Sequence, residues 1–284
     1  MNIVRYLMMK NNVKQILLLG CDVTKTKDFY EPKLTNKEKY VRSDSMIVAL
    51  INKETSSVAL VSLMRDIWVD IEGFGQDRIN TAIVKGGPKL AVKTVNQYFN
   101  LDIDSYIVLN MESLVDIVDE IGGIDINLND DEIYYINEEI NNAKRVSSRS
   151  LDTPCPILDK AGINHLNGLQ TLAHVRDRYF GFCWKRGERQ RDVLKAMINK
   201  VKKDTNKKKM AMFGLKMLKY VKTNLSPLDI IELAKIAINV DPSKIKTHCV
   251  PTEGTYNMVN DGVWRFEIDF IENSRQLQEL INSL

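Results

Sequence analysis

The stretch RSDSMIVALINKETSSVALVSLMRD, residues 42–66, decides the fold of this 284-residue chain. It contains two apolar runs rich in β-branched residues and leucine, Ser45–Asn52 and Val58–Met64, joined by the short polar segment 53–57. Two such runs with a short polar connection predict an antiparallel hairpin. The start of the first strand and the end of the second must therefore lie at the same edge of one sheet.

A third apolar run precedes this hairpin. Residues Lys14–Gly20 (KQILLLG) predict a strand that ends just before Cys21 and Asp22. If this strand runs parallel to Val58–Met64, its end joins the same edge, and loops at strand ends are common places for active sites. The charged residues gathered there would be Asp22, Arg42, Asp44, Arg65 and Asp66.

Carboxylates next to arginines suit the binding of a divalent cation together with a phosphate. Carboxylate oxygens are ligands for Mg²⁺, and a guanidinium group takes two phosphate oxygens at once. The same residues are also typical of ordinary ion pairs at the ends of surface strands. Their position alone leaves both interpretations open.

Strands and helices alternate along the remaining chain, without a break in composition, which predicts a single α/β domain. Residues 129–158 are polar, contain Asn, Ser and Pro, and predict a long variable excursion. The other predicted strands are Ile103–Asn110, Ile124–Leu128, Ile245–Val250 and Val263–Phe266. The predicted helices are Pro88–Phe99, Glu112–Ile121, Asn167–His174, Gly187–Lys203, Lys207–Lys222, Ser226–Asn239 and a last one from about Asp269.

A second group of basic residues lies near the start of the helix Gly187–Lys203. Arg186 and Gln190 are four residues apart, so on a helix they share a face with the apolar stripe that continues at Val193. A polar group at a helix N-terminus suits a phosphate, and a cluster of arginines favours recognition of a planar oxyanion. The alternative is a solvated basic turn. The arginines of this group are Arg176, Arg178, Arg186, Arg189 and Arg191.

Composition excludes several other classes of protein. Hydrophobic residues make up 44% and charged residues 27%, as in an ordinary globular protein, and the net charge of +3 gives no reason to expect a nucleic-acid partner. The sequence contains no run of about 18 apolar residues, so it predicts no membrane-spanning helix. The four cysteines form no CxxC pair, and the three histidines lack zinc spacing. Cys155 and Cys183 are candidates for a disulfide in an oxidising compartment.

Eight short motifs follow one another through residues 13–203. They are LLLGCD (17–22), RSDS (42–45), SLMRD (62–66), DRIN (77–80) followed by GGP (86–88), DEIGGID (119–125), HLNGLQ (165–170), LAHVRDR (172–178) and RGERQ (186–190). In this order they resemble the motifs of the LytR–CpsA–Psr (LCP) cell-wall glycopolymer transferases of bacteria. So many ordered matches are very improbable by chance.

The resemblance implies a single three-layer α/β/α domain over residues 13–284, with a mixed central sheet. An apolar tunnel between sheet and helices would hold a polyprenyl (pyro)phosphate lipid. Residues 204–284 would be the C-terminal helices and strands, and residues 1–12 a leader or the remnant of an anchor region. Family members usually have an N-terminal membrane helix, which is absent from this chain, and they act on the extracytoplasmic face of the membrane.

The implied activity is that of a phosphotransferase, which moves a phosphoglycan such as teichoic acid or capsule from a polyprenyl pyrophosphate carrier to peptidoglycan. By resemblance, Asp22 and Asp44 hold Mg²⁺ or Mn²⁺, and Arg65, Asp66 and Arg42 are catalytic. The residues implied to bind the pyrophosphate are Arg42, Arg65, Arg78, Arg176, Arg178, Arg186, Arg189 and Gln190.

Two positions depart from the family pattern: Cys183-Trp184-Lys185 replaces a frequent Asp-Phe-Gly, and Arg78 replaces a lysine. Two other functions stay open. One is a polyprenyl pyrophosphate phosphatase or pyrophosphatase, with water in place of a sugar hydroxyl. The other is a non-catalytic lipid-binding regulatory module, although such a module has no evident need for paired carboxylates.

Overall fold

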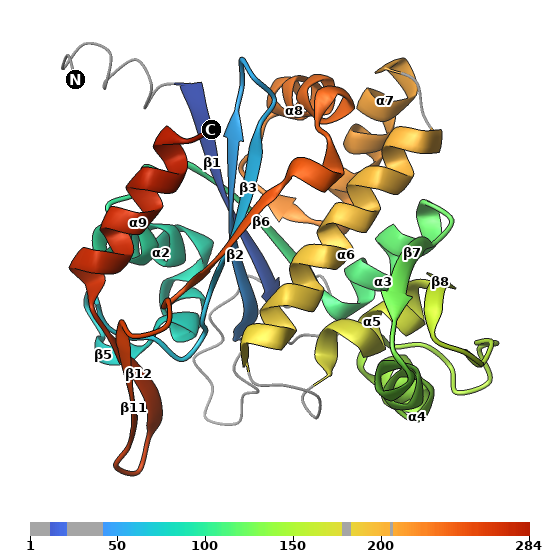
Figure 1. Cartoon of the computed structure of the whole chain (residues 1–284), viewed down its shortest axis with the longest axis horizontal. Helices are drawn as coiled ribbons and strands as arrows, with labels where there is room; N and C mark the ends of the chain where they lie inside the picture. Colours follow the sequence, from blue (N-terminus) through green and yellow to red (C-terminus); the bar gives the residue numbers. More distant parts are fainter. Residues whose placement is uncertain (1–11, 22–41, 178–182, 205–206) are drawn as a thin grey trace.

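The computed structural model describes residues 12–21, 42–177, 183–204 and 207–284. A six-stranded mixed sheet forms the middle layer, with its strands in the order β10-β3-β2-β1-β6-β9 (Figure 1). These strands are β1 (Val13–Cys21), β2 (Ser43–Asn52), β3 (Val58–Leu63), β6 (Ser105–Asn110), β9 (Lys222–Thr223) and β10 (Lys246–Val250). Because β2 is antiparallel to both β1 and β3, the strands β1 and β3 run in the same direction. The predicted hairpin and its shared sheet edge are both confirmed.

Helices cover both faces of this sheet. Figure 1 shows α2 and α9 on one side and α6 and α8 on the other, which confirms the three-layer α/β/α architecture. The helices are α2 (Ala82–Phe99), α3 (Met111–Glu120), α4 (Asp130–Val146), α5 (Gly168–Arg176), α6 (Cys183–Asp204), α7 (Lys207–Met217), α8 (Pro227–Asn239) and α9 (Phe270–Asn282). The two-stranded ribbons are β4 (Trp68–Ile71) with β5 (Gly75–Arg78), β7 (Ile124–Leu128) with β8 (Gly162–Leu166), and β11 (Tyr256–Asn260) with β12 (Trp264–Ile268).

Strand alternation explains why the sheet needs two helical layers. Successive side chains of a strand point to opposite faces. In β1, Leu17 and Leu19 are completely buried and belong to the same apolar cluster as Phe99 of α2. Their neighbour Ile16 belongs instead to the cluster that contains Ile236 of α8. Since both faces of the strand are apolar, the sheet is stable only when both are covered.

A third apolar cluster lies beside α6 and joins α3, α4, α5, β7 and β8. The prediction of a variable excursion over residues 129–158 is wrong in its first half, because α4 occupies Asp130–Val146. Its N-terminus is a capping box in which the Asn129 and Glu132 side chains bind each other's backbone N–H groups. The apolar residues Ile133, Ile136 and Ala143 bury one face of this helix in the cluster.

Other predicted elements change less. The helix predicted at Pro88 begins after a kink, because Gly86 and Gly87 are non-helical and Gly87 has a φ of 71°. The helix predicted over Lys207–Lys222 ends at Met217, and Lys222 instead joins the sheet edge in β9. In the part of the chain that the structure describes, no helix is both long and apolar enough to cross a membrane.

Candidate functional site

Strand register brings the predicted charged residues to one edge of the sheet. Cys21, the last residue of β1, is the register partner of Ser43 in β2, so the end of β1 lies next to Asp44. The β2–β3 hairpin brings Arg65 and Asp66, which follow β3, to the same edge. Asp22 comes directly after Cys21 in the chain and is outside the described residues.

Five side chains of alternating charge form a continuous row at this edge, which we call the charge ladder. Its members, in order of contact, are Arg186, Asp44, Arg65, Asp66 and Arg78. Asp44 accepts hydrogen bonds through Oδ1 from Arg65 (2.8 Å) and through Oδ2 from Arg186 (3.2 Å). Asp66 Oδ2 accepts from Arg65 Nε at 3.3 Å, and its Oδ1 lies 3.6 Å from Arg78 Nε. The ladder therefore links residues from four separate parts of the sequence.

The ladder holds Asp44 in its ionised form. Burial by itself raises the pKa of this carboxyl, but the charges of Arg186 and Arg65 and their hydrogen bonds outweigh burial, so the pKa is lowered. Burial also opposes the charge of Arg65, and the neighbouring Asp44 and Asp66 carboxylates reverse the effect and raise its pKa. Every member of the Arg186–Asp44–Arg65 contact is thus charged at neutral pH.

Helix α6 delivers its polar residues to this edge by a close approach to the sheet. A Cβ atom added at Gly187 would lie 3.1 Å from Ser62 Oγ of β3, so a larger residue would fit only after a shift of a few tenths of an ångström. Arg186 reaches Asp44, and Gln190 Oε1 accepts a hydrogen bond of 2.8 Å from Ser45 Oγ. The prediction that Arg186 and Gln190 share a face is confirmed, because both line the same cavity.

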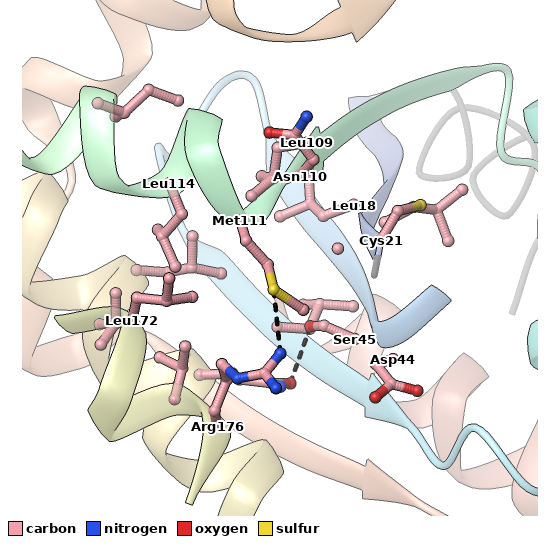
Figure 2. Close-up of a pocket in the computed structure, with 18 of the residues that line it drawn as sticks. Leu18, Cys21, Asp44, Ser45, Leu109, Asn110, Met111, Leu114, Leu172 and Arg176 are labelled. Carbon is pink, nitrogen blue, oxygen red and sulfur yellow. Dashed lines mark hydrogen bonds between the residues drawn. The ribbon is translucent and has the colours of Figure 1, made fainter. Parts of the chain in front are cut away.

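An apolar cavity of about 140 Å³ opens beside the ladder (Figure 2). It lies between the sheet and the helices α3, α5 and α6, and the family resemblance likewise implies an apolar space between sheet and helices. Its walls are formed mainly by Leu18, Ile47, Leu109, Met111, Leu114, Ile117, Leu172, Val175, Val193, Leu194 and Met197. Its polar residues are Asp44, Ser45, Asn110, Arg176, Arg186 and Gln190. The cavity therefore joins an apolar interior to a charged rim.

Arg176 and Asn110 line this cavity from the end of helix α5 and the end of strand β6. Arg176 is the last residue of α5, and its Nη1 donates to the Met111 sulfur at 3.0 Å, as Figure 2 shows. Asn110 is 1% exposed and caps α3 by accepting from the Ser113 N–H at 2.7 Å. Asn110 is a cavity residue that sequence reasoning missed, although its place before a helix is a recognisable capping signal.

Arg189, another predicted pyrophosphate ligand, does not line the cavity and is held by two carboxylates instead. Its guanidinium is 8% exposed and pairs with Glu132 of α4 at 3.0 Å and with Asp177 at 2.8 Å. Asp177, which is 1% exposed, directly follows Arg176. Arg189 thus joins α6 to α4 and to the end of α5 through the two ion pairs of its buried guanidinium, which we call the Arg189 tie.

The remaining predicted residues are spread around the site. Arg42 is exposed just before β2, and Arg178 is outside the described residues. Arg78 contacts Asp66 and donates from Nε to the Trp264 carbonyl oxygen at 2.9 Å. Sequence reasoning missed Trp264, since it lies 186 residues from Arg78 and has no local signal of a site. Cys155 has a free thiol, and the side chain of Cys183, its candidate disulfide partner, is outside the described part of the structure.

The chain matches the LytR_cpsA_psr family over residues 3–282. It is 33% identical over 246 residues to the polyisoprenyl-teichoic acid–peptidoglycan teichoic acid transferase TagU of Enterococcus faecalis, covering 86% of this chain and 73% of TagU. It is 28% identical over 237 residues to the transferase of the same description, TagV, of Bacillus subtilis, covering 80% of this chain and 56% of TagV.

Solved structures show the same fold. The crystal structure of B. subtilis TagV matches with a TM-score of 0.71 and 24% identity, over 95% of this chain and 98% of that one. The crystal structure of B. subtilis TagT matches with a TM-score of 0.70 and 25% identity, over 97% and 92%. A TagT structure described with bound octaprenyl pyrophosphate lipid matches with a TM-score of 0.66 and 24% identity, over 96% and 92%. With a family match over nearly the whole chain, this protein belongs to the LytR_cpsA_psr family.

Proposed function

We propose that this protein transfers a phosphoglycan from a polyprenyl pyrophosphate carrier to peptidoglycan. The observation that carries this proposal is an apolar cavity whose rim bears Arg176, Arg186 and Gln190 next to the charge ladder. A molecule that fits such a site has a long apolar tail and an anionic head. The relatives TagU and TagV are named as teichoic acid transferases that act between a polyisoprenyl carrier and peptidoglycan.

The cavity would bind the isoprenoid tail through burial alone. Each buried methylene contributes about 0.8 kcal/mol, so a few isoprene units supply substantial affinity without any polar contact. The wall residues come from β1, β2, α3, α5 and α6, which are packed elements of the domain. A largely preformed cavity of this kind spares the cost of ordering a loop on binding.

The pyrophosphate would lie at the rim. Arg176 and Arg186 face the cavity from two different helices, and Arg65 extends the positive charge along the ladder. Guanidinium groups held by carboxylates are oriented before the substrate arrives, so they stabilise charge that develops on the phosphates in the transition state. The reaction needs positioning and charge stabilisation more than a covalent nucleophile.

In the proposed reaction a sugar hydroxyl of peptidoglycan attacks the glycan-side phosphorus. A bond forms between the hydroxyl oxygen and that phosphorus, and the bond from phosphorus to the bridging oxygen breaks. Polyprenyl phosphate leaves, and the hydroxyl proton passes to a carboxylate of the ladder or to Asp22. Arg65, Asp66 and Arg42 keep the catalytic roles that the family resemblance implies.

Magnesium dependence is part of this proposal. Among residues 12–21, 42–177, 183–204 and 207–284, no three His, Cys, Asp or Glu side chains are grouped as metal ligands. Mg²⁺ nevertheless needs only one or two carboxylates when phosphate oxygens and water complete its shell. The ionised Asp44 at the cavity rim fits that requirement, with Asp22 as the second candidate. Bound there, Mg²⁺ or Mn²⁺ would supply neutralisation of phosphate charge.

The site of action follows from the same substrates. Peptidoglycan lies outside the cell membrane, so a transferase of this kind acts on the extracytoplasmic face. The polyprenyl carrier keeps the reaction at the membrane surface. We therefore place the protein at that face, with the lipid-linked glycan and peptidoglycan as its partners and without a nucleic-acid partner.

Native mass spectrometry with lipid extraction tests the proposal. We expect polyprenyl phosphate or pyrophosphate to co-purify, and we expect the double variant Arg176→Ala, Arg178→Ala to lose it. Arg275→Ala is the matched control, because Arg275 is an exposed arginine of α9 paired with Glu272. Product analysis with and without a peptidoglycan acceptor then distinguishes transfer from pyrophosphate hydrolysis. A protein that binds no added polyprenyl pyrophosphate in the presence of Mg²⁺ would refute the proposal.

A further inference from the structure

The charge ladder has two different ends. Its Arg186–Asp44 end lines the apolar cavity, whereas Arg65, Asp66 and Arg78 are not among the lining residues. At the Arg78 end the ladder continues into the β11–β12 hairpin, because Arg78 donates to the Trp264 carbonyl oxygen at 2.9 Å. The Phe266 N–H also donates to the Asp66 carbonyl oxygen at 2.9 Å. The hairpin backbone is therefore attached to Arg78 and Asp66 by two hydrogen bonds.

The same hairpin presents an exposed aromatic ring. Trp264 is 40% exposed, although the indole lies against the buried Phe266 ring at a centroid distance of 6.0 Å. Phe266 in turn contacts Trp184 in the first turn of α6, which also carries Arg186. The Trp264 indole is thus supported by Phe266 and keeps an exposed apolar surface. Figure 1 shows the β11–β12 hairpin projecting from the body of the domain.

The in-line geometry of phosphoryl transfer determines which substrate lies at which end of the charge ladder. The attacking and leaving oxygens lie roughly in line on opposite sides of the phosphorus. If the lipid tail occupies the cavity, the leaving polyprenyl phosphate lies at the Arg186–Asp44 end. The attacking hydroxyl must then approach from the Arg78 end, where the hairpin is. Asp66 is the carboxylate of the ladder on that side, and it would take the hydroxyl proton as the new oxygen–phosphorus bond forms.

We infer that the Trp264 surface of the β11–β12 hairpin binds the acceptor glycan, with the indole stacked on a pyranose ring. A flat aromatic ring with a polar N–H suits the apolar face and polar rim of a sugar. The hairpin belongs to residues 204–284, outside the stretch that carries the family motifs. The inference rests on the proposed function, because it takes the lipid side of the ladder from that proposal.

The variant Trp264→Ala tests the inference, since it removes the ring and keeps the carbonyl that Arg78 contacts. With a peptidoglycan-derived tetrasaccharide as acceptor, we expect the acceptor KM to rise about tenfold and the donor KM to stay within about twofold. Trp264→Phe should recover most of the loss, because it restores an aromatic face. Tyr134→Ala is the matched control: Tyr134 is a 65% exposed aromatic residue of α4, which contributes no ladder residue.

Calorimetric titration with the same tetrasaccharide measures saccharide binding in the absence of the donor. Weaker saccharide binding by Trp264→Ala than by Tyr134→Ala supports the inference. The inference would be overturned if Trp264→Ala left the acceptor KM and saccharide binding unchanged, or if it raised the donor KM and the acceptor KM equally. In either case, transfer by the wild-type protein would leave the proposed function standing. A wild-type protein that binds the saccharide through Trp264 but neither binds nor transfers the lipid-linked donor would overturn the proposed function instead.

Discussion

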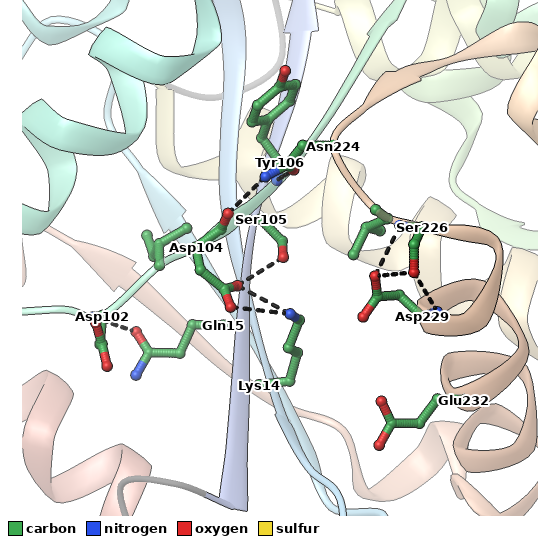
Figure 3. A network of polar contacts seen from close by, with 12 residues as sticks. Lys14, Gln15, Asp102, Asp104, Ser105, Tyr106, Asn224, Ser226, Asp229 and Glu232 are labelled. Carbon is green, nitrogen blue, oxygen red and sulfur yellow. Dashed lines mark hydrogen bonds and ion pairs between the residues drawn. The ribbon is translucent and has the colours of Figure 1, made fainter.

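The two ends of strand β1 carry polar networks of different kinds. At the Val13 end, Lys14 Nζ binds Asp104 at 3.0 Å, and Asp104 also accepts from Ser105 Oγ at 2.7 Å (Figure 3). Gln15 accepts from the Asp102 N–H at 2.9 Å. These contacts tie β1 to the start of β6. Because Gln15 satisfies a backbone N–H group and Lys14 pairs with Asp104, these contacts stabilise the pairing of β1 with β6.

At the Cys21 end the charge ladder joins side chains from distant segments and borders an apolar cavity. Its arginines are 13% to 26% exposed, so they keep access to a ligand while their carboxylate partners hold them in place. One sheet thus carries at one end a polar network that does not line the cavity and at the other end a network that does. Polarity alone therefore does not mark a site, whereas an accessible charge beside apolar space does.

The largest expected effect comes from breaking the middle of the ladder. Arg65→Ala should lower the transfer rate about 1,000-fold, or about 4 kcal/mol, because it removes charge stabilisation at the phosphates. Asp44 and Asp66 keep Arg186 and Arg78 as partners, so the protein should stay folded. Single-turnover transfer and urea unfolding of the same preparation measure the two effects. A transfer rate within tenfold of wild type would contradict the assignment of the charge ladder as the functional end of the sheet.

A matched pair of substitutions tests the role of Arg189. Asp177→Asn and Glu132→Gln each remove one carboxylate from this buried guanidinium, at a cost of about 3 kcal/mol in unfolding free energy. Only Asp177 is adjacent to Arg176, so we expect Asp177→Asn alone to weaken polyprenyl pyrophosphate binding, by about tenfold. Equal losses of lipid affinity in both variants would mean that Arg189 acts on the fold as a whole.

His174 of α5, which is close to the Arg189 tie, predicts that the free energy of unfolding depends on pH. Its side chain is 3% exposed, and burial lowers its pKa to about 4. Between pH 4 and the ordinary histidine pKa of about 6.5, the unfolded chain binds a proton that the folded one does not. The stabilisation is therefore complete above about pH 6.5 and falls by up to about 3 kcal/mol as the pH drops toward 4.

Urea unfolding between pH 4.5 and 7.5 measures this dependence. His174→Gln should flatten the slope, whereas the exposed His165, which pairs with Asp125, provides the control His165→Gln. If His174→Gln kept the wild-type dependence of unfolding free energy on pH, other groups would be responsible for it.

The smallest effect is expected at the opposite end of β1. Lys14→Met removes an ion pair whose Asp104 side chain is 68% exposed, which costs less than about 1 kcal/mol in unfolding free energy. Transfer activity should equal that of wild type, because no residue of this network lines the cavity. A loss of activity without a loss of stability would show that the two ends of the sheet are coupled.

Much of the site was predictable because its signals are local. The hairpin over residues 42–66 follows from apolar runs and a polar turn, and it determines that Arg65 and Asp44 meet. The spacing of Arg186 and Gln190 likewise determines a shared helix face. The helix α4 was missed although Asn129 and Glu132 form a capping box, since its polar composition masked a narrow apolar stripe.

Other features were decided only by tertiary structure. Arg189 lies three residues from Arg186 on the same helix, yet it turns to Glu132 and Asp177 because α4 and the end of α5 pack against that side of α6. Trp264 meets Arg78 across 186 residues of chain. Periodicity depends on neighbours within a few residues, so the sequence by itself determined most of the elements and the sheet edge, and its ordered motifs indicated the family. Which surfaces meet depends on packing between distant segments, and that decided the cavity, the tie and the hairpin's place beside the ladder.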